Sequence, residues 1–138
     1  MPRELLLRRG EAPDDALIMP IASNPKSKPN PDVRLGMHQD KDEDQSSLKA
    51  GIPVVSISIG DAGDFAYAPV PKKTHNKGDG DFPGEKSVKL ESGDLLVFGG
   101  PSRLAFHGVR KVHNASKPKG LMMRPGRLNL TFRQYSLK

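Results

Sequence analysis

The feature that most constrains the fold is a series of short apolar segments separated by turns rich in glycine, proline and aspartate. The clearest segment is "IPVVSISIG" (52–60), which is rich in β-branched residues and ends at Gly60. Branched side chains favour strands, and a Gly-Asp pair favours a tight turn. Further candidate strands lie in "VRLGMHQD", "GDFAYAP", "KSVKLES", "DLLVFGG", "RLAFHGVRKV" and "RLNLTFRQYS". Short strands without a long helix predict an all-β-dominated antiparallel sandwich or jelly roll.

The first 32 residues differ from this pattern. The segment "MPIASNPKSKPNPD" holds four prolines in fourteen residues, which excludes regular structure there. A short helix over residues 2–9 is the one element expected before it, because proline is tolerated early in a helix. The sequence therefore predicts an irregular, poorly ordered N-terminal segment (1–32) followed by one core domain (33–138).

Composition removes several classes of protein and of site. The chain has no cysteine, so disulfides and thiolate metal sites are excluded, and His, Asp and Glu remain as metal ligands. No apolar run reaches the length of a membrane span, and the N-terminus is too acidic and interrupted for a signal peptide. We expect an intracellular monomer in the nucleus or cytoplasm, without membrane contact.

The charge is unevenly distributed along the chain. The net charge is +6, yet residues 95–138 hold nine Lys or Arg and no Asp or Glu. Such a basic half suits a polyanionic partner such as nucleic acid. Ordinary solubilising charge explains the same composition equally well.

The chemistry-bearing pattern begins at "HQD" (38–40). Residues i and i+2 of a strand point to the same side, so His38 and Asp40 aim at one point. His107, inside the alternating strand "RLAFHGV", is the candidate third ligand, whereas His75 and His113 are expected at the surface. Two histidines and one carboxylate form the facial triad of non-haem Fe(II) oxygenases. A solvated acidic turn and hydrogen-bonded strand histidines are the alternatives.

The last strand, "GRLNLTFRQ", alternates apolar and polar residues. Its polar face carries two arginines with an amide and a hydroxyl between them, namely Arg127, Asn129, Thr131 and Arg133. Arginine forks bind carboxylates bidentately, so this face suits a dicarboxylate such as 2-oxoglutarate. Since six strand residues span roughly 20 Å, one arginine is expected to be the main anchor. An exposed edge strand with solvated arginines is the alternative.

Together, "RLGMHQDKDE", "PVVSISIGDAGDF", "LESGDLLVFGGPSRLAFHGV" and "GRLNLTFRQ" resemble the AlkB family of Fe(II)- and 2-oxoglutarate-dependent dioxygenases, in the right order over about three quarters of the chain. The resemblance implies a double-stranded β-helix and three reactants at the site: Fe(II), 2-oxoglutarate and O₂. It implies oxidative demethylation of N-alkylated bases in DNA or RNA, with release of formaldehyde, succinate and CO₂. The target base must leave its stack to be reached.

The resemblance also implies roles for individual residues. The iron ligands would be His38, Asp40 and His107. Arg127 would bind the distal carboxylate of 2-oxoglutarate, and Arg133 would stabilise its keto-acid end with the help of Asn129. Leu35 and Ser56 would line the cosubstrate pocket, and Asp42 would contact the flipped base.

The chain departs from the family pattern before His38. Family members carry a longer segment there that forms helices and a nucleotide-recognition lid, whereas 37 residues precede His38 here. An upstream Asn-x-Tyr pattern that contacts 2-oxoglutarate is replaced, with Ser27 and Pro29 at the corresponding places. The alternatives are therefore a truncated, weak or inactive fragment acting as a nucleic-acid-binding module, or a cupin-like metal-binding barrel with another chemistry.

Overall fold

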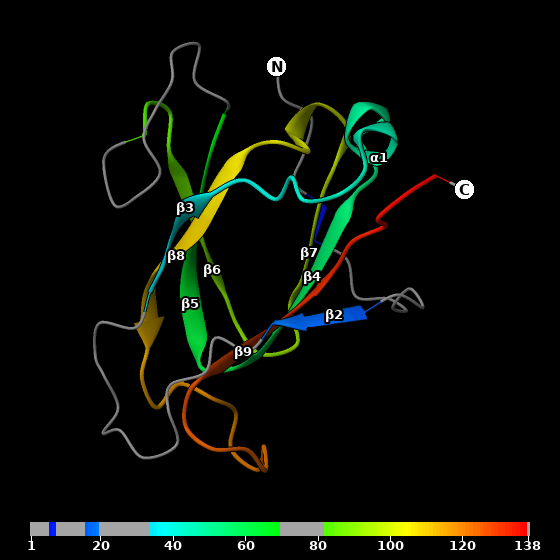
Figure 1. Cartoon of the computed structure of the whole chain (residues 1–138). Coiled ribbons are helices and arrows are strands. Elements are labelled where there is room, and N and C mark those ends of the chain that lie inside the picture. The colour runs from blue at the N-terminus through cyan, green and yellow to red at the C-terminus, as the bar shows by residue number, and fades with distance from the viewer. Residues whose placement is uncertain (1–5, 8–15, 20–33, 70–81, 138) are drawn as a thin grey trace.

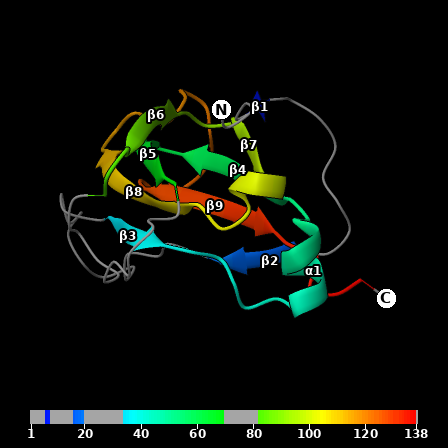
Figure 2. The ribbon, with the colours of Figure 1, turned by 90° about the horizontal axis from the view of Figure 1, so that it is seen from above.

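The computed structural model describes residues 6–7, 16–19, 34–69 and 82–137, which form two antiparallel sheets. The five-stranded sheet has the order β1-β7-β4-β9-β2, and the four-stranded sheet has the order β3-β8-β5-β6 (Figure 1). The view from above shows the two sheets as separate layers (Figure 2). The strands are β1 (Leu6–Leu7), β2 (Ala16–Met19), β3 (Leu35–His38), β4 (Val54–Gly60), β5 (Ala62–Ala68), β6 (Lys86–Leu90), β7 (Leu95–Phe98), β8 (Phe106–His113) and β9 (Arg127–Phe132).

The main core lies between the two sheets. In β4, buried and half-buried residues alternate along the whole strand, as expected when one face of a strand packs on a core. A buried cluster joins Val54 of β4 and Leu96 and Phe98 of β7 to Phe65 of β5 and Leu90 of β6. Because the cluster draws on both sheets, burial of its apolar surface holds the layers together. Seven candidate strands of the sequence are confirmed as β3 to β9.

Strand β9 has an unusual orientation. It lies between β4 and β2, so it is not an edge strand. Its register places Asn129 opposite the buried Ser58 and Arg127 opposite Gly60, so the polar face of β9 turns to the inside of the sandwich. Arg127 is only 5% exposed, whereas Leu128 and Leu130 on the other face are half-buried. The alternative of solvated arginines on an edge strand is therefore wrong for Arg127.

A tight turn joins the two sheets between β4 and β5. Gly60 has φ of 95°, which disfavours residues with a side chain, and a Cβ there would lie 2.4 Å from the carbonyl oxygen of Gly126. Asp61 is buried, and its carboxylate accepts hydrogen bonds from the backbone N–H groups of Lys117 and Gly126. The turn thus fixes the start of β9 beside the end of β4.

One short α-helix, α1 (Gln45–Ala50), follows β3 and was not predicted. Asp44 caps its N-terminus by accepting a hydrogen bond from the backbone N–H of Ser46, and Gly51 ends it in the left-handed conformation. Gly100–Ser102 form a 3₁₀ turn between β7 and β8. Among the described residues, no helix is long and apolar enough to cross a bilayer.

The N-terminal prediction is wrong at two places. Leu6–Leu7 pair with β7 and Ala16–Met19 pair with β9, both antiparallel. The helix expected over residues 2–9 is therefore not formed at Leu6 and Leu7, where backbone pairing with a sheet edge replaces it. The rest of the segment 1–32 lies outside the described residues, and the boundary at residue 33 stays a prediction.

Candidate metal centre

The three predicted ligands meet between the ends of two paired strands. His38 ends β3, and the sheet register places it directly opposite His107 of β8. One ligand atom from each of His38, Asp40 and His107 lies within 4.8 Å of the others. Asp40 bridges the two rings, with its Oδ1 3.7 Å from His38 Nε2 and its Oδ2 3.3 Å from His107 Nε2. The three side chains therefore converge as predicted, although Asp40 lies beyond the end of β3 and not within the strand.

Hydrogen bonding presents the same nitrogen of each ring to the centre. His38 Nδ1 lies 2.9 Å from the carbonyl oxygen of Gly36, and His107 Nδ1 lies 3.0 Å from that of Ala105. A carbonyl only accepts, so each Nδ1 carries a proton, and in the neutral ring each Nε2 keeps the lone pair that a metal would bind. Metal-bound histidines are oriented by this kind of second hydrogen bond. The donor set therefore fits a divalent metal.

Burial and charge favour the metal-binding protonation states of His38 and Asp40. Burial lowers the pKa of His38 below its ordinary value of 6.5, which favours the neutral ring. Burial alone would raise the pKa of Asp40, but the hydrogen bond and charge of His107 and the charge of Arg133 outweigh it. The pKa of Asp40 is therefore lowered, and its carboxylate stays ionised.

A glycine lets the two ligand strands approach closely. A Cβ at Gly108 would lie 2.5 Å from the carbonyl oxygen of Leu35 and 2.9 Å from that of Gly36. The absence of a side chain at Gly108 leaves room for the backbone of β3. His107 itself packs on Phe65 and Phe98, with ring centroids 5.8 and 4.8 Å away.

Charged residues surround the centre on the side of α1. Arg133, just after β9, places Nη1 3.5 Å from Asp40 Oδ1 and 3.1 Å from Oε1 of Glu43. Glu43 also pairs with Arg103, whose Nη2 lies 3.0 Å from Oε2. Glu43 and Arg103 are buried, and sequence reasoning missed both.

The other arginine of β9 has a different environment. Arg127 donates to the hydroxyl of Ser58 at 2.5 Å and to the carbonyl oxygens of Asp61 and Leu90 at 3.1 and 3.3 Å. Among the described residues, no carboxylate lies within ion-pair distance of it, and its Nε is buried without a hydrogen-bond partner. Burial lowers the pKa of Arg127 below its ordinary value, and the charge of Asp94 partly offsets this effect. Arg127 is thus a buried cation without a carboxylate in direct contact.

Polar residues line the inner face between the two arginines. Ser56 donates to Asn129 Oδ1 at 2.7 Å, and Asn129 Nδ2 donates to the hydroxyl of Thr131 at 3.0 Å. Since Ser56 is only 6% exposed, this hydrogen-bonded group belongs to the interior.

The comparisons with known proteins decide the family. The model of the 2OG-Fe(II) oxygenase superfamily matches residues 29–133, which include both histidines, Asp40 and β9. The chain belongs to the 2OG-Fe(II) oxygenase superfamily. Within it the chain is AlkB-like, as its motifs predicted, and the double-stranded β-helix of the prediction is confirmed. Fe(II), 2-oxoglutarate and O₂ are accordingly its expected cofactors and cosubstrates.

Relatives of this oxygenase chain come from plants and bacteria. It is 50% identical over 106 residues to the DNA N(6)-methyladenine demethylase ALKBH1C of Arabidopsis thaliana, covering 74% of this chain and 21% of that protein. It is 35% identical over 108 residues to the alpha-ketoglutarate-dependent dioxygenase AlkB of Escherichia coli, covering 78% and 43%. A solved structure, that of OsALKBH1, matches with a TM-score of 0.64 and 50% identity over 73% of this chain and 44% of that one. The chain therefore spans less than half the length of these relatives.

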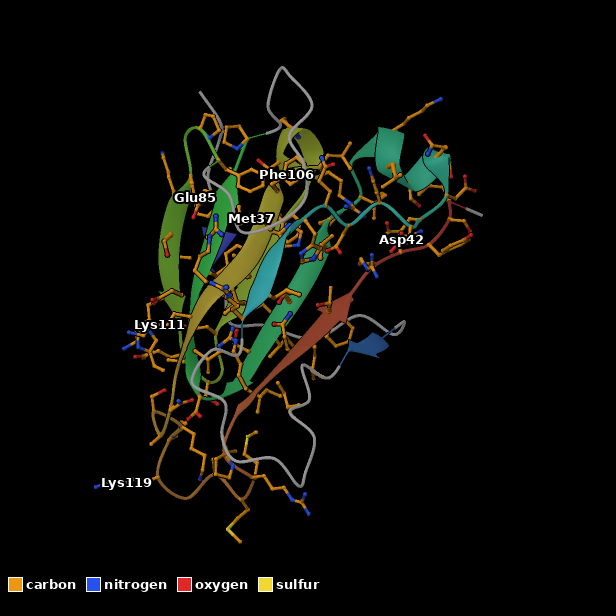
Figure 3. The ribbon with its side chains drawn as sticks, turned by 60° about the vertical axis from the view of Figure 1, so that its left-hand side comes forward. Met37, Asp42, Glu85, Phe106, Lys111 and Lys119 are labelled. Carbon is orange, nitrogen blue, oxygen red and sulfur yellow. The ribbon has the colours of Figure 1, made fainter. Side chains whose placement is uncertain are left out.

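The remaining predicted site residues of the oxygenase chain are more exposed. Asp42 is 91% exposed and lies on the link between β3 and α1, close to the end of β9 (Figure 3). Leu35 is 37% exposed and pairs with Val109. His113 is not part of the metal group and pairs with Asp64 at 2.8 Å, and His75 lies outside the described residues.

The basic excess of residues 95–138 is divided between the interior and the far end of the molecule. Arg103, Arg127 and Arg133 are buried or nearly so and face the candidate site. Lys119 lies at the opposite end of the molecule from Asp42 (Figure 3). Part of the charge that suggested a polyanionic partner is therefore used inside the fold. For Arg103, its position four residues before His107 was the one sequence signal of a role at the site. For Glu43 there was no such signal, because its neighbours in the sequence are also acidic.

Proposed function

We propose that this chain carries the catalytic core of an Fe(II)- and 2-oxoglutarate-dependent dioxygenase that demethylates N-alkylated bases in DNA or RNA. The observation that carries the proposal is the convergence of His38, Asp40 and His107, with both Nδ1 atoms bonded to carbonyl oxygens and both Nε2 atoms turned toward Asp40. Bound Fe(II), together with 2-oxoglutarate and O₂, would supply the oxidising chemistry. The relatives' names make N6-methyladenine in DNA the first base to test.

In this proposal the two histidines and Asp40 hold the metal on one face. Three protein ligands on one side leave the other positions for the cosubstrate. The apolar packing of Phe65 and Phe98 on His107 restricts the ring and limits the access of water from the core side. The chain thus supplies a fixed ligand geometry at the mouth of the sandwich.

Arg127 is proposed as the anchor for the distal carboxylate of 2-oxoglutarate. A buried cation without a carboxylate partner is costly, and a dicarboxylate ligand would provide the missing charge. Arg133 and Asn129 would orient the keto-acid end, and Ser56 and Leu35 would contribute to the wall of the pocket. Ser56 supports this role through its hydrogen bond to Asn129.

Asp42 is proposed to address the substrate base. Its carboxylate is exposed beside the metal ligands, and its Oδ2 lies 3.9 Å from Arg133 Nη1. An acceptor at the entrance can bind the exocyclic amine of a base that has left its stack. We also propose an intracellular location, in the nucleus or cytoplasm, because the proposed substrate is nucleic acid. We propose that the protein is a monomer.

The test is a turnover assay on the 138-residue chain with Fe(II), 2-oxoglutarate and oligonucleotides that carry methylated bases. We expect succinate and formaldehyde in equal amounts, and neither product from His38→Ala. Oligonucleotide binding without succinate would instead support the alternative of a non-catalytic nucleic-acid-binding fragment. Metal binding without any 2-oxoglutarate binding would favour another metal-barrel chemistry.

A further inference from the structure

Glu43 is a buried acid, whereas most acidic side chains lie at the protein surface. Its side chain is 4% exposed and lies between two arginines from distant parts of the chain. Oε2 is 3.0 Å from Arg103 Nη2, and Oε1 is 3.1 Å from Arg133 Nη1. Neither oxygen of Glu43 makes a hydrogen bond, so the two ion pairs alone compensate the cost of burying this charge. We therefore expect Glu43, Arg103 and Arg133 to have a role other than stabilising the fold.

Arg103 connects this cluster to a metal ligand. Its Nη1 donates to the backbone carbonyl oxygen of Asp40 at 2.6 Å, while Nη2 pairs with Glu43. Next to it, Gln39 donates from Nε2 to the carbonyl oxygen of Leu104, also at 2.6 Å. The segment that bears Asp40 is thus tied to the segment that leads into His107. The ties fix the two ligands relative to each other across 67 residues of sequence.

Glu43 also decides where the charge of Arg133 is directed. Nη1 of Arg133 is closer to Glu43 than to Asp40, at 3.1 Å against 3.5 Å. Without the carboxylate of Glu43, Asp40 would be the nearest anion for this guanidinium. An arginine paired tightly with a ligand carboxylate competes with a metal for the same oxygen atoms. Glu43 therefore keeps Asp40 available.

We propose that Glu43 and Arg103 are positioning residues of the metal centre, Arg103 by holding the backbone of Asp40 and Glu43 by holding Arg103 in place and drawing Arg133 away from Asp40. This inference rests on the proposed function, because it assumes that the three ligands bind a divalent metal. Neither residue touches the metal ligands' donor atoms, so both act through other groups.

The test measures the dissociation constant of Mn(II), a redox-stable probe, on the 138-residue chain by competition with a chromophoric chelator. Arg103→Lys keeps the charge but replaces the fork with one nitrogen, which cannot hold both partners in the same geometry. Glu43→Gln keeps the shape and removes the charge. We expect each variant to bind Mn(II) roughly 10-fold or more weakly, the usual effect of losing a group that orients a ligand.

The matched control is Glu85→Gln. Glu85, just before β6, forms a short pair with Arg110 of β8, at 2.6 and 3.0 Å, outside the metal group. We expect this variant to change the Mn(II) dissociation constant by less than about twofold. Thermal melting of the metal-free variants, recorded in parallel, separates loss of fold from loss of affinity.

Metal affinity within about twofold of the parent for both cluster variants would overturn the inference, whatever their melting temperatures. If Glu43→Gln does not fold, Arg103→Lys decides, supported by Gln39→Ala, which removes a half-buried tie and should give a smaller loss in the same direction. A parent chain that binds Mn(II) but releases no succinate would refute the proposed function alone. A parent chain that binds no Mn(II) would refute both.

Discussion

The two arginines on the inner face of β9 illustrate two ways of burying a cation. Arg133 lies beside Asp40 and Glu43, and its charge is balanced by the protein. Arg127, six residues earlier, has only neutral partners: a hydroxyl and two carbonyl oxygens. Arg127 begins β9 and Arg133 directly follows its end, so the two share one local sequence pattern, which does not explain the difference.

What differs is the element packed against each arginine. The β3–α1 link brings acids to Arg133. Arg127 instead contacts Ser58 of β4 and the backbone carbonyls of Asp61 and of Leu90 at the end of β6. An arginine that is already paired with carboxylates of the protein can support the metal centre without binding the incoming anion itself. A cation that the protein has left unbalanced is prepared to bind one. The comparison therefore assigns the metal to one end of β9 and the diacid anchor to the other.

The largest effect is expected at the metal end. Asp40→Ala removes the carboxylate that lies between the two imidazoles. Mn(II) affinity should therefore fall by more than about 100-fold, which exceeds the loss expected for a group that only orients a ligand. Metal titration measures it. Asp64→Ala is the matched control, since Asp64 pairs with His113 away from the site. Retained affinity in Asp40→Ala would remove the basis of the metal assignment.

The next effect is expected at the other end of β9. Arg127→Ala should weaken 2-oxoglutarate binding to the Mn(II)-loaded chain by about 2 kcal/mol or more, roughly 30-fold, because a buried charge pair loses one partner. Calorimetry measures it, and Mn(II) affinity should change far less. Arg124→Ala, on the exposed loop before β9, is the control. If cosubstrate affinity stayed the same, the anchor would have to be sought at Arg133.

A smaller effect is expected where β3 and β8 touch. Gly108→Ala places a Cβ against the carbonyl oxygens of Leu35 and Gly36, so the strands must separate at a cost of about 1–3 kcal/mol. Chemical denaturation should show this loss, and Mn(II) affinity should fall while the Arg127 end keeps its packing. Gly120→Ala is the control. Its new Cβ meets nothing within 4 Å, so any effect should be on stability and not on metal affinity. Unchanged metal affinity in Gly108→Ala would show that the strands adjust without moving the ligands.

The smallest effect is expected at Asp42. This carboxylate is 91% exposed and 3.9 Å from Arg133, so Asp42→Asn should alter Mn(II) affinity by less than about twofold. The preference among methylated bases should change instead, as measured by succinate formation on different oligonucleotides. A large loss of metal affinity would show that Asp42 contributes to the metal centre and not only to substrate binding.

The sequence predicted the strands and, in part, the ligand triad because both depend on short spacings. His38 and Asp40 are two residues apart and His107 stands in an alternating strand, but the resemblance to the AlkB family was needed to assign the three residues as ligands. The direction of the β9 faces was not predictable, because alternation does not say which face is inside. Glu43 and Arg103 were missed because charged residues are normally exposed and their contact spans 60 positions. The short helix α1 escaped since six residues hold too little periodicity.

Each imidazole of the centre is hydrogen-bonded to the carbonyl group two positions earlier in the chain, Gly36 for His38 and Ala105 for His107. A large part of each ring's orientation is thus fixed within a tripeptide. Insertions or deletions in remote connections can accumulate without turning the rings. A slip of β3 along β8 would, by contrast, leave two correctly aimed rings that no longer share a target, which makes strand alignment the vulnerable quantity in any redesign of this centre.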